Sequence, residues 1–250
     1  MRRGLLIVDR GSREPEVSKE LDVITKKVHT RGGYDYADFC FLEVLPPFIN
    51  DAIQKCPSDN LDTLTIVPYF LYPGRKIKAC VTSIMKYQQN IKTKFLVTKP
   101  MSMHPIMAKL VDRRIIDTLK KNNQDINRNK TDVLLIGHGS KDINAQLSIN
   151  YIVKELQKSY RNVSRCFLEI EQPDIRTGIA RCERDDPLVL VIVFYFLHEG
   201  IHVKKDIKCD LLPALERSRL KNAYITNHIG TDDAMVDLIL ERALEVEDAD

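Results

Sequence analysis

The chain has 250 residues, of which 44% are hydrophobic and 29% charged, a composition typical of a globular protein with one large domain or two small ones. The net charge of +3, with no basic run interleaved with aromatic residues, argues against nucleic-acid binding. The longest apolar run, residues 188–197, is far shorter than the ~20 residues of a membrane-spanning helix. The six cysteines form no CxxC pair and no signal peptide precedes the first apolar run, so we expect a cytoplasmic protein with reduced thiols.

The first half of the chain alternates predicted strands and helices. Apolar, β-rich runs at 4–8, 36–43, 64–71 and 95–98 predict strands. Helices are predicted up to about residue 29, over 46–55, from about 76 onward and over 106–120. Residues 122–130 are polar and carry no periodicity, which indicates a linker.

The second half repeats the first. The run VDRGSR at 8–13 matches IGHGSK at 136–141, CFLE at 40–43 matches 166–169, and YFL at 69–71 matches 195–197. Motif, order and spacing recur together, so we expect two units, 1–121 and 131–250, joined by the linker 122–130. Each should be a flavodoxin-like α/β unit with a four-stranded parallel sheet flanked by helices. We expect the two units to be related by a pseudo-two-fold axis, with a cleft between them.

The turn after the first strand of the second half has the strongest functional signal. Residues 133–136 form an apolar run typical of a buried strand, and Asp142 can cap the following helix. Between them lies Gly137-His138-Gly139-Ser140, at the carboxyl edge of the predicted sheet, where open α/β folds bind ligands. A histidine that merely packs in this turn is the plain alternative.

Comparing the two halves identifies a candidate metal site. His138 corresponds to Arg10, and His202, after the third strand, corresponds to Lys76. Neutral imidazoles bind divalent metals, whereas guanidinium and ammonium groups do not. His138 and His202 are therefore candidate ligands for Zn, Co, Ni or Fe in the second half, with Glu169 as a third ligand or a base.

Other residues near these turns give weaker signals. His198 is a possible second ligand, although a solvated loop histidine is the simpler interpretation, and His228 can line the same mouth. A group of lysines flanks the two turns and forms either a solvated helix face or a contact for a polyanionic ligand. These are Lys141, Lys204, Lys205 and Lys208.

With these residues in view, the chain resembles the CbiX-type sirohydrochlorin chelatases, the class II chelatases of tetrapyrrole biosynthesis. The motifs are GHGSKD at 137–142, CFLEIEQPDI at 166–175 and FYFLHEGIHVKKDI at 194–207, with weaker counterparts at 8–16, 41–53 and 68–81. The resemblance covers nearly the whole chain. It is to the long form, in which two units are fused, rather than to the short form, which dimerises.

The resemblance implies insertion of a divalent metal into sirohydrochlorin with release of two protons. Co²⁺ is the expected metal substrate, with Fe²⁺ or Ni²⁺ as alternatives, and no permanent cofactor is expected. It implies His138 and His202 as metal-handling residues and Glu169 as the neighbouring acid, in one working site per chain, as a monomer or a weak homo-oligomer. The tetrapyrrole carboxylates would meet basic side chains and the backbone N–H groups of the turn, namely Lys141, Lys204, Lys205, Arg10, Lys76, Gly139 and Ser140.

Three other functions are open to such a chain. A non-catalytic tetrapyrrole or metal carrier would keep the site but show no turnover. A histidine phosphatase would need an arginine before His138, where this chain has Gly137. A generic flavodoxin-like binding domain would need a Ser/Thr-rich phosphate loop, which is absent.

Overall fold

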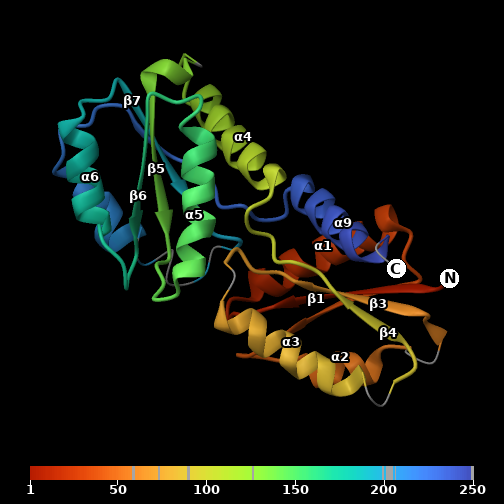
Figure 1. Cartoon of the computed structure of the whole chain (residues 1–250). Coiled ribbons are helices and arrows are strands. Elements are labelled where there is room, and N and C mark those ends of the chain that lie inside the picture. The colour runs from red at the N-terminus through yellow and green to blue at the C-terminus, as the bar shows by residue number, and fades with distance from the viewer. Residues whose placement is uncertain are drawn as a thin grey trace. The chain divides into compact units, whose positions relative to one another are not determined.

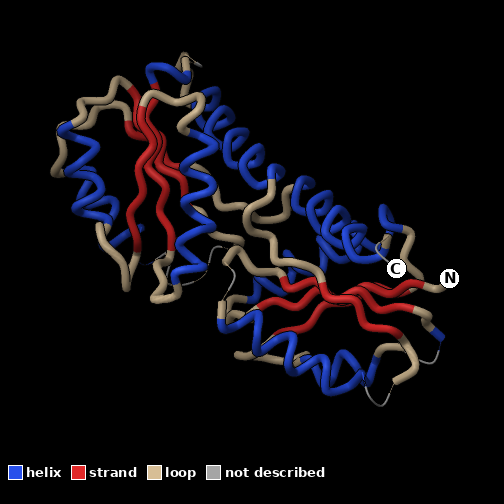
Figure 2. Tube along the Cα trace, in the orientation of Figure 1, coloured by secondary structure: helices blue, strands red, loops and turns tan. Residues whose placement is uncertain are grey.

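The computed structural model describes residues 1–57, 60–72, 74–88, 91–125, 127–198, 200, 205 and 207–248, except the side chains of Arg75, Lys76 and Lys208. The chain forms two compact units, and each contains one four-stranded sheet (Figures 1 and 2). The strand orders are β2-β1-β3-β4 and β6-β5-β7-β8, with all pairs parallel. The prediction of two four-stranded parallel sheets flanked by helices is confirmed.

Unit 1 comprises residues 1–104 and 231–250. Helices α2 and α3 cover one face of its sheet, where Cys40, Ile66 and Ile84 lie in the core, and α1 and α9 cover the other (Figure 1). The central strand β1 is almost wholly buried, which explains its uninterrupted apolar run. The elements are β1 (Arg3–Asp9), α1 (Pro15–Gly32), β2 (Tyr36–Phe41), α2 (Ile49–Lys55), β3 (Thr63–Pro68), α3 (Arg75–Gln88), β4 (Lys94–Val97) and α9 (Asp233–Glu247).

Unit 2 comprises residues 105–230 and repeats this arrangement. Helix α6 and the segment containing α8 cover one face of the sheet, and α4 and α5 cover the other (Figure 1). The elements are α4 (Pro105–Lys121), the 3₁₀ helix η2 (Arg128–Lys130), β5 (Thr131–Gly137), α5 (Ile143–Leu156), β6 (Asn162–Phe167), α6 (Ile175–Arg184), β7 (Val189–Phe194), the π-helix η3 (Ile207–Leu211), α8 (Leu212–Glu216) and β8 (Ala223–Ile225).

The compact units differ from the sequence repeats in their final helices. Helix α4, which ends the first repeat, packs against α5, β7 and β8 of unit 2. Helix α9, which ends the second repeat, packs against α1, β3 and β4 of unit 1. The division expected from sequence, 1–121 and 131–250, therefore differs from the packing, and residues 122–130 lie inside unit 2 instead of between the units.

Helices α4 and α9, which each pack in the unit formed mainly by the other sequence repeat, are held there partly by carboxylate contacts. Glu247 of α9 pairs with Arg3 at 2.7 Å and accepts a hydrogen bond from the Tyr34 hydroxyl at 3.0 Å. In unit 2, Asp112 of α4 pairs with Arg128 at 2.6 Å and accepts a hydrogen bond from the Tyr160 hydroxyl at 2.7 Å. Burial raises the pKa of both tyrosines, so the hydroxyls remain donors.

An arginine on each of these helices, buried on α9 and partly buried on α4, holds the loop after the fourth strand. Arg242 of α9 donates to the carbonyls of Pro100 at 3.0 Å and Ser102 at 2.8 Å. Arg114 of α4, its counterpart at the repeat offset of 128, donates to the Ile229 carbonyl at 2.7 Å. Matching contacts thus hold α9 in unit 1 and α4 in unit 2.

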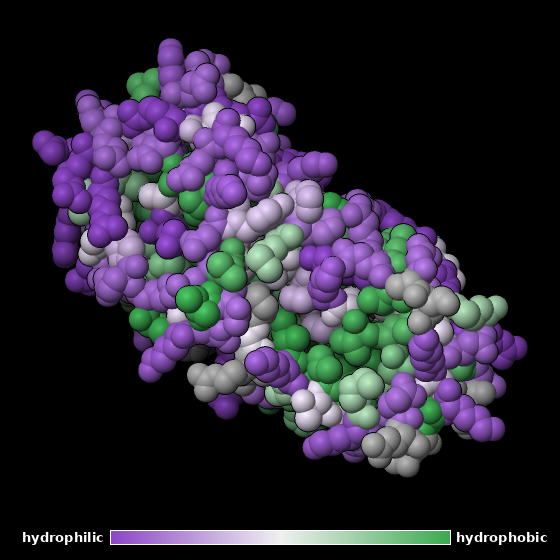
Figure 3. All heavy atoms as spheres, in the orientation of Figure 1, coloured by the Kyte–Doolittle hydropathy of each residue, from purple (hydrophilic) through white to green (hydrophobic). Residues whose placement is uncertain are grey.

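The visible surface is mostly hydrophilic, with apolar residues exposed in patches (Figure 3). Among the described residues, no helix is both long and apolar enough to span a bilayer. Of the six cysteines, all unpaired, only Cys209 is exposed. Burial raises the pKa of the Cys40 and Cys166 thiols, the equivalent cysteines of the second strands.

Candidate active site

The turn after β5 is built around a glycine at which any side chain would be strained. Gly139 has a φ of +91°, and a Cβ on it would lie 1.9 Å from the carbonyl oxygen of Glu169. The hydroxyl of Ser140 accepts a hydrogen bond from the Asp142 N–H at 3.0 Å, and the Asp142 carboxylate caps α5 through the Asn144 N–H. The predicted cap at Asp142 is confirmed, and the turn lies at the carboxyl end of the central strand.

Two side chains with metal-binding chemistry meet at this turn. The Nε2 atom of His138 lies 3.3 Å from Oε1 of Glu169, and both side chains are substantially exposed, at 40% and 61%. The other ring nitrogen, Nδ1, lies 3.3 Å from the Gly139 carbonyl oxygen, so each ring nitrogen has an oxygen acceptor within 3.3 Å. With the ring proton on Nδ1, the Nε2 lone pair and the Glu169 carboxylate would both be available to a metal ion between them.

The separation of these two atoms fits shared coordination of one metal ion. Ligands about 2.1 Å from a tetrahedral metal lie about 3.4 Å from each other. The Glu169 N–H also donates to the His138 carbonyl at 3.1 Å, so the backbone holds the two turns together. The structure therefore brings together His138 and Glu169, two of the three residues predicted to handle the metal.

Unit 1 has the same turns with different chemistry. Gly11 has a φ of +96°, and a Cβ on it would lie 2.2 Å from the Glu43 carbonyl oxygen. In place of the histidine, Arg10 donates through Nε to Oε1 of Glu43 at 2.9 Å. A guanidinium stays protonated and has no lone pair for a metal. Where unit 2 has the pair His138–Glu169, unit 1 thus has the pair Arg10–Glu43 at the equivalent positions.

The remaining predicted residues are only partly described. His202 and Lys204 lie outside the described residues, as do the side chains of Lys76 and Lys208. Lys141 and Lys205 are exposed, and His198 and His228 are partly buried. Within the described part of the chain, no group of three or more His, Cys, Asp or Glu side chains is placed to hold a metal.

One residue at the site was missed by the sequence analysis. The N–H of Ser140, expected to bind a substrate carboxylate, donates instead to Oε1 of Glu171 at 2.7 Å. The equivalent of Glu171 in the first repeat is Leu45, so a comparison of the halves contains the signal. Through its side chain, Glu171 links the turn after β6 to the turn after β5.

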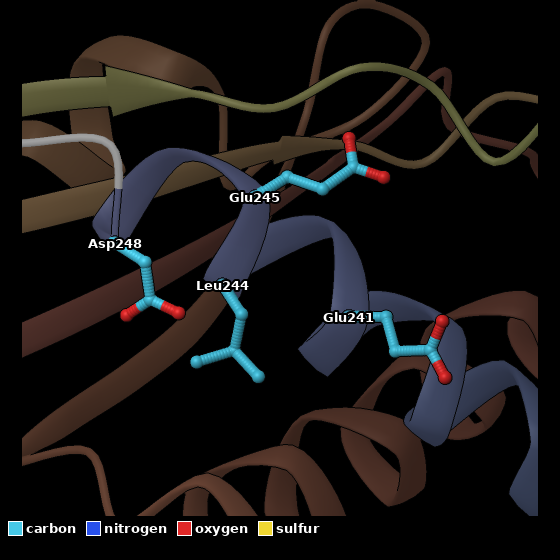
Figure 4. Close-up of a pocket in the computed structure, with 4 residues that line it drawn as sticks. All are labelled: Glu241, Leu244, Glu245 and Asp248. Carbon is cyan, nitrogen blue, oxygen red and sulfur yellow. The ribbon is translucent and has the colours of Figure 1, made fainter.

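A surface hollow of about 460 Å³ lies on α9 of unit 1. It is lined by Glu241, Leu244, Glu245 and Asp248, with the carboxylates of Glu241 and Asp248 on either side of Leu244 (Figure 4). None of the predicted site residues lines it, and its residues belong to a helix far along the chain from both turns.

The fold and the paired turns define a duplicated chelatase-like α/β protein. A model of the CbiX family matches residues 4–118 and again residues 132–246. The chain therefore belongs to the CbiX family, with two units in tandem.

Curated relatives and solved structures agree with this assignment. The chain is 24% identical to the sirohydrochlorin cobaltochelatase of Priestia megaterium, over 81% of this chain and 67% of that protein. It is 23% identical to the sirohydrochlorin ferrochelatase of the same organism, over 94% and 87%. The solved structure of SirB from Bacillus subtilis with Fe³⁺ matches with a TM-score of 0.83 at 22% identity, over 98% of this chain and 95% of that one. This structural likeness establishes the fold.

Proposed function

We propose that the chain is a sirohydrochlorin chelatase, which inserts a divalent metal into the macrocycle with release of two protons. The exposed pair of His138 and Glu169, at the carboxyl edge of the unit 2 sheet, carries this proposal. The names of the curated relatives support the reaction class, since they include both cobalt and iron chelatases. Co²⁺ is the proposed metal, and Fe²⁺ is the alternative that direct assay distinguishes.

The chemistry follows from the two side chains. Unprotonated Nε2 of His138 and the Glu169 carboxylate hold the incoming metal, and His202 is the proposed further ligand. The substrate loses two pyrrole N–H protons as the metal enters, and the proposed acceptors are Glu169 or a histidine that has released the metal. Because a ligating imidazole must be unprotonated, metal affinity falls in acid. The proposed contacts for the substrate carboxylates are the basic residues Arg10, Lys76, Lys141, Lys204 and Lys205.

The test is metal insertion by the purified protein, followed through the absorbance of sirohydrochlorin with Co²⁺ or, without oxygen, Fe²⁺. His138→Ala should lower kcat/KM by about 100-fold or more, because it removes a ligand at the reacting centre. Arg10→Ala should mainly raise KM, and His29→Ala, at an exposed histidine of α1, should change neither. Near-normal insertion by His138→Ala would contradict the site.

The same assay separates the enzyme from a carrier. A carrier would bind sirohydrochlorin or the metal and give no metallated product. The cytoplasmic location and the monomeric or weakly oligomeric state remain predictions.

A further inference from the structure

A strained turn directly follows each of the two site glutamates. In unit 2, the Glu171 N–H donates to the Glu169 carbonyl at 2.7 Å, and Ile170 between them has a φ of +69°. A hydrogen bond from residue i+2 to residue i around a positive φ defines the γ-turn that is rare in proteins. For a β-branched residue such as Ile170 this backbone region is especially unfavourable.

The neighbouring turn holds this conformation in place. The Glu169 carbonyl lies against Gly139, where even a Cβ would not fit. On the other side of Ile170, the Glu171 carboxylate accepts the Ser140 N–H at 2.7 Å. Both neighbours of Ile170 are therefore tied to the His138 turn, and the isoleucine lies between them with 56% of its surface exposed.

Unit 1 contains the same turn. Val44 has a φ of +81°, the Leu45 N–H donates to the Glu43 carbonyl at 3.1 Å, and Val44 is 46% exposed. The backbone conformation thus belongs to the fold of both units. It does not require a β-branched side chain, because glycine or asparagine adopts a positive φ at lower cost. Packing within each unit does not explain the isoleucine either, since more than half of it is exposed.

We propose that Ile170 is a substrate-positioning residue, whose side chain packs against the flat apolar face of the tetrapyrrole beside His138 and Glu169. This proposal rests on the proposed function. Basic side chains can bind the anionic rim of the macrocycle, but long flexible lysines do not fix the distance of its face from the metal ligands. A stiff β-branched side chain on a turn fastened at both ends provides a fixed contact for that face.

The experiment measures binding of metal-free sirohydrochlorin, steady-state insertion kinetics and thermal stability in matched variants. Ile170→Asn removes the apolar contact and suits the positive φ, so it should melt at or above the wild-type temperature. It should raise Kd and KM for sirohydrochlorin about five-fold or more, as expected for losing the burial of half an isoleucine, and also lower kcat, because the macrocycle face is no longer held at a fixed distance from the metal ligands. Ile170→Leu, which keeps an apolar side chain, should restore KM to within about two-fold of wild type.

Leu188→Asn is the control, because Leu188 is similarly exposed (62%) but precedes β7 at the opposite end of the sheet. It should leave Kd and KM unchanged. If wild-type protein binds and metallates sirohydrochlorin while Ile170→Asn does so with unchanged Kd and KM, the positioning role is wrong and the proposed function stands. If wild-type protein neither binds nor metallates sirohydrochlorin, both proposals are wrong.

Discussion

Replacing Gly139 with alanine separates the cost of misfolding the turn from the cost of losing the metal site. The added Cβ would lie 1.9 Å from the Glu169 carbonyl oxygen, whereas carbon and carbonyl oxygen come no closer than about 3.3 Å. The two turns must therefore move apart by roughly 1.4 Å, and alanine must also adopt a φ of +91°. Gly11→Ala imposes the same change on unit 1, where the Cβ would lie 2.2 Å from the Glu43 carbonyl oxygen.

The expected magnitudes follow from these contacts. A left-handed alanine costs about 1–2 kcal/mol, and loss of a hydrogen bond between the turns adds about 1 kcal/mol. A total of about 2–3 kcal/mol lowers the melting temperature of a chain of this size by about 4–12 °C. Displacing catalytic groups by about 1 Å can lower the rate about 100-fold, so Gly139→Ala should lower kcat/KM for metal insertion by that factor.

The assay compares both variants by scanning calorimetry and by insertion of Co²⁺ into sirohydrochlorin. Gly11→Ala should match the loss of stability yet keep kcat within about ten-fold of wild type, because its turn carries Arg10 instead of a metal ligand. Equal losses of activity in the two variants, or near-normal activity in Gly139→Ala, would refute the assignment of the chemistry to the turn of unit 2.

Three further outcomes are expected. Arg242→Ala should lower the free energy of unfolding by about 3 kcal/mol in denaturant titrations, because two loop carbonyls lose a buried charged donor, and an effect below about 1 kcal/mol would contradict this. Hydrogen bonds from Lys27 and Arg31 lower the pKa of Asp233 from 3.8 to about 2, so its contribution is complete above pH 4 and lost as the pH falls towards 2. The stability difference between Asp233→Asn and wild type should therefore disappear over that range in denaturant titrations. With a thiol reagent, Cys209 should react quickly and the five buried cysteines only on unfolding; several fast thiols would contradict their burial.

The repeat in sequence was enough to predict the sheets. Paired strand registers follow the same offsets as the motifs, since Val8 pairs with Cys40 in unit 1 and Ile136 with Cys166 in unit 2. It was not enough to predict which sheet each final helix covers. The two sheets are near copies, so the apolar pattern of a helix does not tell which sheet it covers, and the pairs Arg3–Glu247 and Arg128–Asp112 are visible only in the structure.

The candidate site was predictable in its chemistry but not in its turn geometry. Alignment of the halves identified His138 and His202 as candidate ligands, with Glu169 as a third ligand or base, and the structure places Glu169 beside His138. The γ-turns at Val44 and Ile170 left no signal, because turn rules associate a positive φ with glycine or asparagine and both positions carry β-branched residues. The bond from Ser140 to Glu171 was also hidden, since it joins a backbone donor to a side chain 31 residues away.

The two side-chain pairs at equivalent turns support the proposal that unit 2 carries the metal chemistry. Glycine conformation and the γ-turn are shared, so both units place a glutamate carboxylate beside the residue that follows the first strand. In unit 1 that residue is always a donor, and Glu43 is committed to the Arg10 ion pair. Such half-exposed pairs contribute about 0–1 kcal/mol, so stability alone does not account for the arginine. In unit 2 the imidazole can present a lone pair, which leaves Glu169 and His138 able to share a metal. Arginine at this position therefore offers unit 1 no metal ligand, whereas its permanent charge suits the proposed contact with a substrate carboxylate.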